Sequence, residues 1–290
     1  MMRTSATATA FRRTVSFSFL GAASRRMASA VCNVCLIQTR FSIADARTQT
    51  FRITRALAVP DADVLKVQLW SPSRLSRKLA VFTSVTAPCV LAQTHKHWEW
   101  RIYTSADIPC MAALRTLASS DPRISIVVVE STPEALVADA DAWLTEASAW
   151  KDGRAALGTM RLDDDDGLPP TALQEANALL AGADAPPFAG FRALHALVLS
   201  DAVPPAVSVS REREFERRFV LASGLTALRG NVHAAGSHAT LADRARVVTF
   251  DAPILQTSDP ASCDTARKSR HGAESFAPLR LDAWLRAGTV

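Results

Sequence analysis

The stretch AALGTMRLDDDDGLPPTALQEANALLAG, residues 155–182, combines three features that are informative about the fold. Its apolar first part, 155–162, predicts a buried strand. Four adjacent aspartates follow, and residues 169–182 predict a helix with proline at its opening and glycine at its close. A strand followed at once by a helix of ten or more residues is the repeating unit of α/β proteins.

The same alternation occurs on both sides of this stretch. Apolar runs predict strands at 31–37, 98–105, 123–130 and 196–200, and amphipathic runs predict helices at 76–94, 111–120 and 132–150. We expect the first of these helices to be broken near Pro88. The predicted fold is therefore α/β, with a mostly parallel central sheet and helices on both faces. Such sheets bind ligands beyond the carboxyl ends of their strands, where the four aspartates fall.

The aspartate cluster, Asp163 to Asp166, has the chemistry of a site for a hard divalent cation. Mg²⁺ and Mn²⁺ prefer oxygen ligands, and one or two carboxylates with substrate phosphates usually suffice. In an extended segment Asp163 and Asp165 project to the same face, so this pair could hold one metal and leave Asp164 for a sugar or ribose hydroxyl. The alternative is a solvated turn that ends a strand. The spacing does not fit an EF-hand loop, and no P-loop motif is present.

Charge is distributed unevenly along the chain. The net charge is +5, but the first 44 residues contain six arginines and no acidic residue. The remainder has 27 basic and 28 acidic residues, which argues against a nucleic-acid partner. Residues 1–30 resemble a targeting segment or an over-extended start before Met27, and we expect them to be disordered.

Neither a membrane span nor a zinc site is predicted. No run of about 18 uninterrupted apolar residues exists. Cys32 and Cys35 fall in a predicted strand, where their side chains point to opposite faces, and no second cysteine pair completes a zinc site. Free buried thiols suit a reducing compartment, so we expect a cytoplasmic protein.

The segment TMRLDDDDGL, 159–168, resembles the signature of the putative rhamnosyl transferases, a family similar to GT-A glycosyltransferases. IQTRFSI (37–43) is similar to the family's first-strand motif. The order Trp70, Arg77, Phe82, Pro88, Gln93-Thr94 and WEWRIYTSAD (98–107) is similar to its next helix and strand. The resemblance covers roughly residues 30–180, and Gly167 stands where the family usually has alanine.

This resemblance implies a GT-A-like enzyme that moves a sugar from a nucleotide-sugar donor to a glycan or other carbohydrate acceptor, and the family's name suggests rhamnose as the sugar. It implies a metal site at Asp163 and Asp165, with Asp166 assisting. It also places Thr39, Arg40 and Asp107 near the donor nucleotide. Arg161 could pair with phosphate or simply neutralise the aspartates.

The catalytic base is not identified by any spacing in the C-terminal part. The candidates are Asp201 and His271, with Glu212, Glu214 and His238 as further acidic or histidine side chains; PILQTS (253–258) resembles part of the family's histidine-containing segment. We expect residues 31–200 to bind the donor and residues 201–290 to lie on the acceptor side. Two alternatives remain: a non-catalytic carbohydrate- or nucleotide-binding relative, and a metal-dependent nucleotidyltransferase or hydrolase.

Overall fold

The structure is a computed structural model of the 290-residue chain. It describes residues 33–45, 62–130, 133–148, 155–181, 188–198, 207–210, 225–228, 230–234, 247–258, 276–278 and 281–287. All described residues belong to one compact unit, Val31–Val290, and residues 1–30, which the sequence predicts to be disordered, lie outside the described residues. None of the helices that these residues form has the length and apolar content to cross a bilayer.

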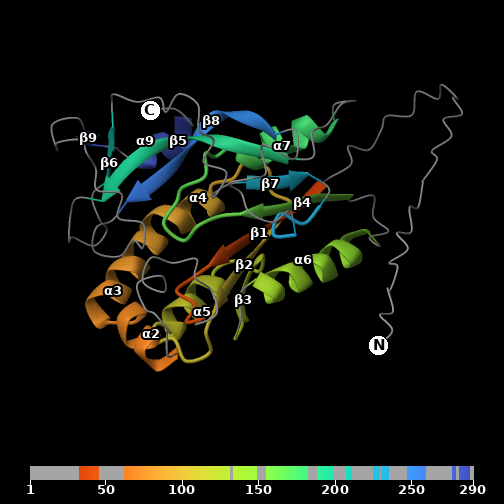
Figure 1. Ribbon diagram of the computed structural model, residues 1–290. Coiled ribbons are helices and arrows are strands. Elements are labelled where there is room, and N and C mark those ends of the chain that lie inside the picture. The colour runs from red at the N-terminus through yellow and green to blue at the C-terminus, as the bar shows by residue number, and fades with distance from the viewer. Residues whose placement is uncertain are drawn as a thin grey trace, which may run out of the picture. The chain divides into compact units, whose positions relative to one another are not determined.

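Four parallel strands form the first half of the sheet (Figure 1). Their order is β3-β2-β1-β4, and each pair of neighbours is parallel. The bounds are β1 Asn33–Arg40, β2 Trp98–Thr104, β3 Ile124–Val128 and β4 Ala155–Arg161. These strands match four of the predicted ones within a few residues. Because they are parallel, their carboxyl ends lie at one edge, with Arg40 and Arg161 as the last residues of β1 and β4.

The second half of the sheet is mixed, and strands on both sides of residue 200 contribute to it. The order continues from β4 through β7, β5, β6 and β9, while β8 pairs with β5. β8 is parallel to β5, whereas the β4–β7, β7–β5, β5–β6 and β6–β9 pairs are antiparallel. The bounds are β5 Phe188–Val198, β6 Val207–Ser210, β7 Leu225–Leu228, β8 Val247–Ser258 and β9 Phe276–Pro278.

Helices cover both faces of the parallel half, which confirms the predicted α/β class. Val34 and Leu36 of β1 pack against α6, Pro133–Ser148. Cys35 and Ile37 point the other way, into the main core. That core is shared by helices α3 Pro72–Val81, α4 Ala87–Leu91, α5 Met111–Ser119 and α7 Ala172–Ala181. In Figure 1, α6 accordingly lies across β1–β3 from α3 and α5.

The predicted break at Pro88 does not occur. α3 continues through a π-helical segment, η1 Phe82–Thr86, directly into α4. Proline lacks an amide hydrogen and its ring crowds the carbonyl four residues before it. The wider π turn, in which the Ala87 amide donates to the Phe82 carbonyl, relaxes the chain just before Pro88. The result is one helical rod from residue 72 to 91.

Two further helices lie outside the predicted ones. Helix α2, Ala62–Leu69, forms within a region that the polar sequence predicts to be irregular. It ends at Leu69, and the indole nitrogen of the next residue, Trp70, donates to the Ser42 carbonyl at 2.9 Å. Ser42 has a φ of 49°, an uncommon left-handed conformation for a residue other than glycine, just beyond the end of β1. The second helix, α9 Leu281–Ala287, buries Trp284 in the main core.

Candidate active site

The acidic turn, defined as Asp163–Asp166, follows β4 at the carboxyl edge of the parallel strands. Its exposure alternates: Asp163 and Asp165 are half-buried, whereas Asp164 and Asp166 are only 6% and 2% exposed. The Asp166 amide donates to the Asp163 carbonyl at 3.4 Å, which closes the turn. The two half-buried carboxylates are therefore the Asp-x-Asp pair that the sequence assigns to a metal.

Asp164 is bound by a lysine that the sequence analysis missed. Lys78 Nζ of α3 lies 2.9 Å from Asp164 Oδ2, and both side chains are about one-tenth exposed. Lys78 follows Leu75 at helical spacing, so its position on the buried side of α3 was the available signal. This pair holds the middle of the turn against the face of the sheet that α3 covers. The predicted contact of Asp164 with a sugar hydroxyl stays a prediction.

Asp166 joins the turn to β8. Its Oδ1 accepts a hydrogen bond from the Thr257 amide at 3.0 Å, and the Thr257 hydroxyl donates to the Asp165 carbonyl. Just beyond, Gly167 and Leu255 exchange two backbone hydrogen bonds at 2.9 and 2.8 Å. The PILQTS segment thus lies against the turn. Whether Asp166 also assists a metal stays a prediction.

Asp163 faces two arginines on the opposite side from Lys78. Its Oδ1 lies 4.0 Å from Arg40 Nη2 and 3.5 Å from Arg161 Nε. Arg40 is an even number of residues from Val34 and Leu36 in β1, so its side chain points to the same face as theirs, the face that α6 covers. Arg161 is the register partner of Gln38, which donates to the Leu136 carbonyl of α6. The structure therefore brings three predicted residues, Arg40, Arg161 and Asp163, together on one face.

The charges around Asp163 affect one another. The pKa of Arg40 is lowered to about 10, chiefly by burial and also by the charge of Arg161, while Asp163 and Asp164 act in the opposite direction. At neutral pH the guanidinium remains charged. Arg40 and Arg161 both lie within ion-pair distance of Asp163. Guanidinium groups bind phosphate as well as carboxylate, so this face suits a phosphate-bearing ligand.

His233 is a further residue of this cluster, and the sequence analysis did not select it. Its pKa is lowered to about 3, chiefly by burial and also by the charges of Arg161 and Arg40, while Asp163 acts in the opposite direction. An imidazole of this kind is neutral at pH 7 and a weak general base. It follows β7, a short strand that the sequence did not reveal, so no signal placed it beside β4.

The other predicted donor residues lie apart from this cluster. Thr39 is fully buried on the opposite face of β1, where its Oγ1 accepts from Trp100 Nε1 at 3.0 Å. Asp107, after β2, is exposed and pairs with Lys66 of α2 at 2.6 Å. The hydrogen bond from Lys66 lowers the pKa of Asp107. Neither observation tests their predicted contact with a nucleotide.

The candidate bases Asp201 and His271, like Glu212, Glu214 and His238, lie outside the described residues. Of the two cysteines of the lone Cys-x-x-Cys, only Cys35 is described; it is buried, and burial raises its pKa to about 12. Cys89 is likewise buried and free. Buried thiols of this kind are unreactive.

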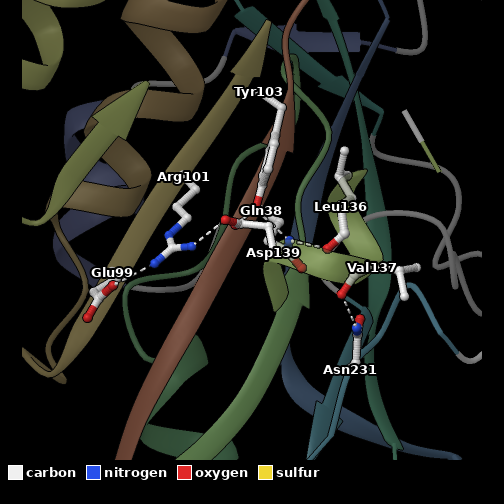
Figure 2. A network of polar contacts seen from close by, with 8 residues as sticks. All are labelled: Gln38, Glu99, Arg101, Tyr103, Leu136, Val137, Asp139 and Asn231. Atoms are coloured by element: carbon white, nitrogen blue, oxygen red, sulfur yellow. Dashed lines mark hydrogen bonds and ion pairs between the residues drawn. The ribbon is translucent and has the colours of Figure 1, made fainter. Parts of the chain in front are cut away.

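A network of polar side chains connects α6 to β1 and β2, on the face of the sheet where Arg40 and Arg161 lie (Figure 2). Gln38 Nε2 donates to the Tyr103 hydroxyl at 2.7 Å, and Tyr103 in turn donates to Asp139 of α6. Arg101 Nη1 binds the other Asp139 oxygen at 2.6 Å. Figure 2 also shows Asn231, next but one to His233, reaching the Val137 carbonyl of α6. These bonds hold α6 against β1 and β2 on the face of the sheet where Arg40 and Arg161 lie.

The comparisons with known proteins identify the family. The model of the family described as putative rhamnosyl transferase matches residues 35–181, half of the chain. The chain belongs to this glycosyltransferase family. The match includes Arg40, Arg161 and the acidic turn but ends before His233 and Thr257. Among curated proteins, no significant match was found.

The solved structures that match this chain include fragments of S. aureus TarS. TarS 1–349 is 9% identical with a TM-score of 0.42, over 78% of this chain and 60% of that one. TarS 1–349 in complex with UDP-GlcNAc is 10% identical with a TM-score of 0.37, over 81% of this chain and 61% of that one. This chain thus spans about three-fifths of those chains. Because the scores are low, we infer nothing about the site from them.

Proposed function

We propose that the protein is a metal-dependent glycosyltransferase that moves a sugar from a nucleotide-sugar donor to an acceptor hydroxyl. The observation that carries this proposal is the convergence of Arg40 and Arg161 on Asp163, beside the half-buried Asp165, at the carboxyl edge of parallel strands. This is where α/β sheets bind ligands. Family membership supports the transferase chemistry; rhamnose as the sugar rests on the family description alone.

The acidic turn can supply two carboxylate ligands to a divalent cation, and the other ligands must come from the substrate and water. Among the described residues, no three histidine, cysteine or acidic side chains are grouped so as to hold a metal by themselves. Mg²⁺ and Mn²⁺ nevertheless bind through one or two carboxylates when a substrate diphosphate and water complete the shell. Asp163 and Asp165 supply two carboxylates, while Asp164 and Asp166 contact Lys78 and Thr257.

In the proposed reaction the leaving group is a nucleoside diphosphate. The cation, when bound, neutralises the negative charge that develops on it. Arg40 and Arg161 add fixed positive charge in a partly buried site, where it acts more strongly than in water. An acceptor hydroxyl must lose a proton, and Asp201 or His271 would take it.

The test is release of nucleoside diphosphate from a panel of nucleotide sugars in the presence of Mn²⁺ or Mg²⁺. We expect release that chelation removes, and that Asp163→Ala and Asp165→Ala each reduce at least about a hundredfold. Glu99→Gln, which removes a negative charge near the amino end of β2, is the matched control and should retain activity.

The other outcomes separate the alternatives. Nucleotide-sugar binding without turnover would favour a non-catalytic relative. Release of pyrophosphate instead of nucleoside diphosphate would favour a nucleotidyltransferase. Activity that persists without a divalent cation would contradict the metal-dependent part of the proposal.

A further inference from the structure

Two buried nitrogen atoms lie beside the acidic turn without a hydrogen-bond partner among the described residues. They are Arg161 Nε and His233 Nε2. Arg161 Nε is 3.5 Å from Asp163, close enough for an ion pair but not for a hydrogen bond. A buried polar atom without a partner costs free energy, and a missing ligand is one common reason for it.

The sheet places both nitrogens on one face. Thr159 and Arg161 are two residues apart in β4, so their side chains project to the same side. The Thr159 hydroxyl accepts from the Val232 amide at 2.7 Å and donates to the Gly230 carbonyl at 3.2 Å. The loop of residues 230–234 therefore covers the side of β4 on which Arg161 lies.

The same loop is tied to α6 and holds His233 in place. Asn231 Nδ2 donates to the Val137 carbonyl at 2.9 Å, as Figure 2 shows, and to Asp141 at 2.8 Å. Asn231 Oδ1 then accepts from the His233 amide at 3.0 Å. The backbone that carries His233 is therefore held both by α6 and by β4, as the support of a preorganised binding residue requires.

We propose that His233 and Arg161, with Arg40 beside them, form the subsite for the diphosphate group of the donor, and that His233 contacts this group through Nε2–H. The inference rests on the proposed function and adds a residue from outside the segment that the family model matches. Guanidinium groups bind phosphate oxygens as well as carboxylates, and both Arg40 and Arg161 point toward Asp163 at this edge of the sheet. A neutral imidazole with its proton on Nε2 donates one more hydrogen bond without further charge repulsion.

A diphosphate fits this cluster better than a cation does. A metal bound by His233 would leave Arg161 Nε without a partner, because a guanidinium N–H does not ligate a cation, whereas oxygens of a diphosphate would satisfy both nitrogens. The two readings differ in their metal dependence. A diphosphate contact operates with or without a cation, but a role of His233 as a metal ligand requires one.

The test measures binding of inorganic pyrophosphate by calorimetry, first in EDTA and then with Mg²⁺. We expect the wild-type chain to bind in EDTA. His233→Leu should weaken binding about tenfold in both conditions, and His233→Gln, which keeps a donor, should retain most of the affinity. His97→Leu, near the amino end of β2, is the matched control and should bind like the wild type.

A second variant keeps the test decisive if His233→Leu unfolds. Arg161→Lys keeps the charge but loses Nε, so we expect about a tenfold loss as well. Wild-type affinity in both His233→Leu and Arg161→Lys, absence of wild-type binding, or a His233 effect seen only with Mg²⁺ would overturn the inference. Pyrophosphate binding without any nucleotide-sugar turnover would instead contradict the proposed function and leave the subsite standing.

Discussion

Gly167, directly after the acidic turn, occupies a site with no space for a side chain. A Cβ atom there would lie 2.9 Å from Cys89 Sγ and 3.3 Å from Leu255 Cβ. The family motif that this segment resembles usually has alanine at this position, so glycine and Cys89 are complementary in this chain. The substitution looks mild in the sequence, and only the structure shows what occupies the space.

We therefore expect Gly167→Ala to destabilise the protein by about 1–3 kcal/mol, because the core around it is already filled. In a Cys89→Ala background the same substitution should cost clearly less, since the sulfur atom is gone. Urea unfolding of the four chains gives the coupling energy. Equal costs in both backgrounds would show that Cys89 is not what excludes the methyl group.

The contribution of the buried Lys78–Asp164 ion pair to stability can be measured with single and double substitutions. Removing Lys78 takes a close counter-charge away from the buried Asp164, so Lys78→Met should destabilise the protein by up to about 3–5 kcal/mol. The double variant Lys78→Met with Asp164→Leu should recover a large part of this loss. Thermal and urea unfolding measure both effects. A double variant as unstable as the sum of the single ones would mean that the two side chains do not act as a pair.

At the scale of single residues, the sequence placed Arg161 beside the aspartates and Arg40 near a strand end, but it did not show which side chains contact which aspartate. Asp163, Arg40 and Arg161 meet because each falls at a strand end, which strand prediction and parallel pairing define. Lys78 and His233 come from a helix face and from a loop after an unrecognised strand. Their positions depend on packing between segments far apart in the chain, and no local pattern records that.

At the scale of elements, α4 and α7 are joined by one buried side chain, Gln93. Its Nε2 donates to the Cys89 carbonyl at 3.0 Å and to the Pro169 carbonyl at 2.8 Å, and its Oε1 accepts from the Leu173 amide at 3.2 Å. The last bond satisfies one of the free amides in the first turn of α7. Gln93 thus fixes the position of residues 169–173, which connect the acidic turn to α7.

Gln93→Met keeps the volume but leaves Pro169 and Leu173 without these bonds, so we expect a loss of about 2–4 kcal/mol. Hydrogen exchange should show faster exchange at the start of α7 than elsewhere. Gln174→Met is the control: Gln174 is exposed and accepts only one peripheral bond from Thr94, so its effect should stay within about 0.5 kcal/mol. Similar losses in the two variants would argue against a specific role of Gln93.

Elements were predictable where local patterns are strong. The strands of the parallel half are apolar or β-branched runs bounded by turns, and their helices are amphipathic, so their order and approximate bounds followed from the sequence. Helix α2 has eight residues, too few for a clear periodicity. Strands β6 and β7 have four residues each and depend on long-range pairing, which sequence periodicity does not encode.

At the scale of the whole molecule, His233 should make the folded state sensitive to mild acid. Its pKa is about 3 in the folded chain, against an ordinary value of 6.5. Below pH 6.5 the unfolded chain binds a proton that the folded chain does not, so the free energy of unfolding decreases as the pH falls toward 3. Between pH 7.5 and 5 this contribution amounts to about 2 kcal/mol, before most carboxylates titrate.

The measurement is urea unfolding of the wild type and of His233→Gln at several pH values from 7.5 to 5. The wild type should lose more stability over this range than the variant, by up to about 2 kcal/mol, because glutamine does not titrate. The comparison cancels the contribution of the other histidines. Parallel curves for the two chains would show that His233 titrates normally, and that the arginines and burial around it do not keep it neutral. Saturating pyrophosphate in EDTA should raise the stability of the wild type more than that of His233→Leu, which links the global measurement to the proposed subsite.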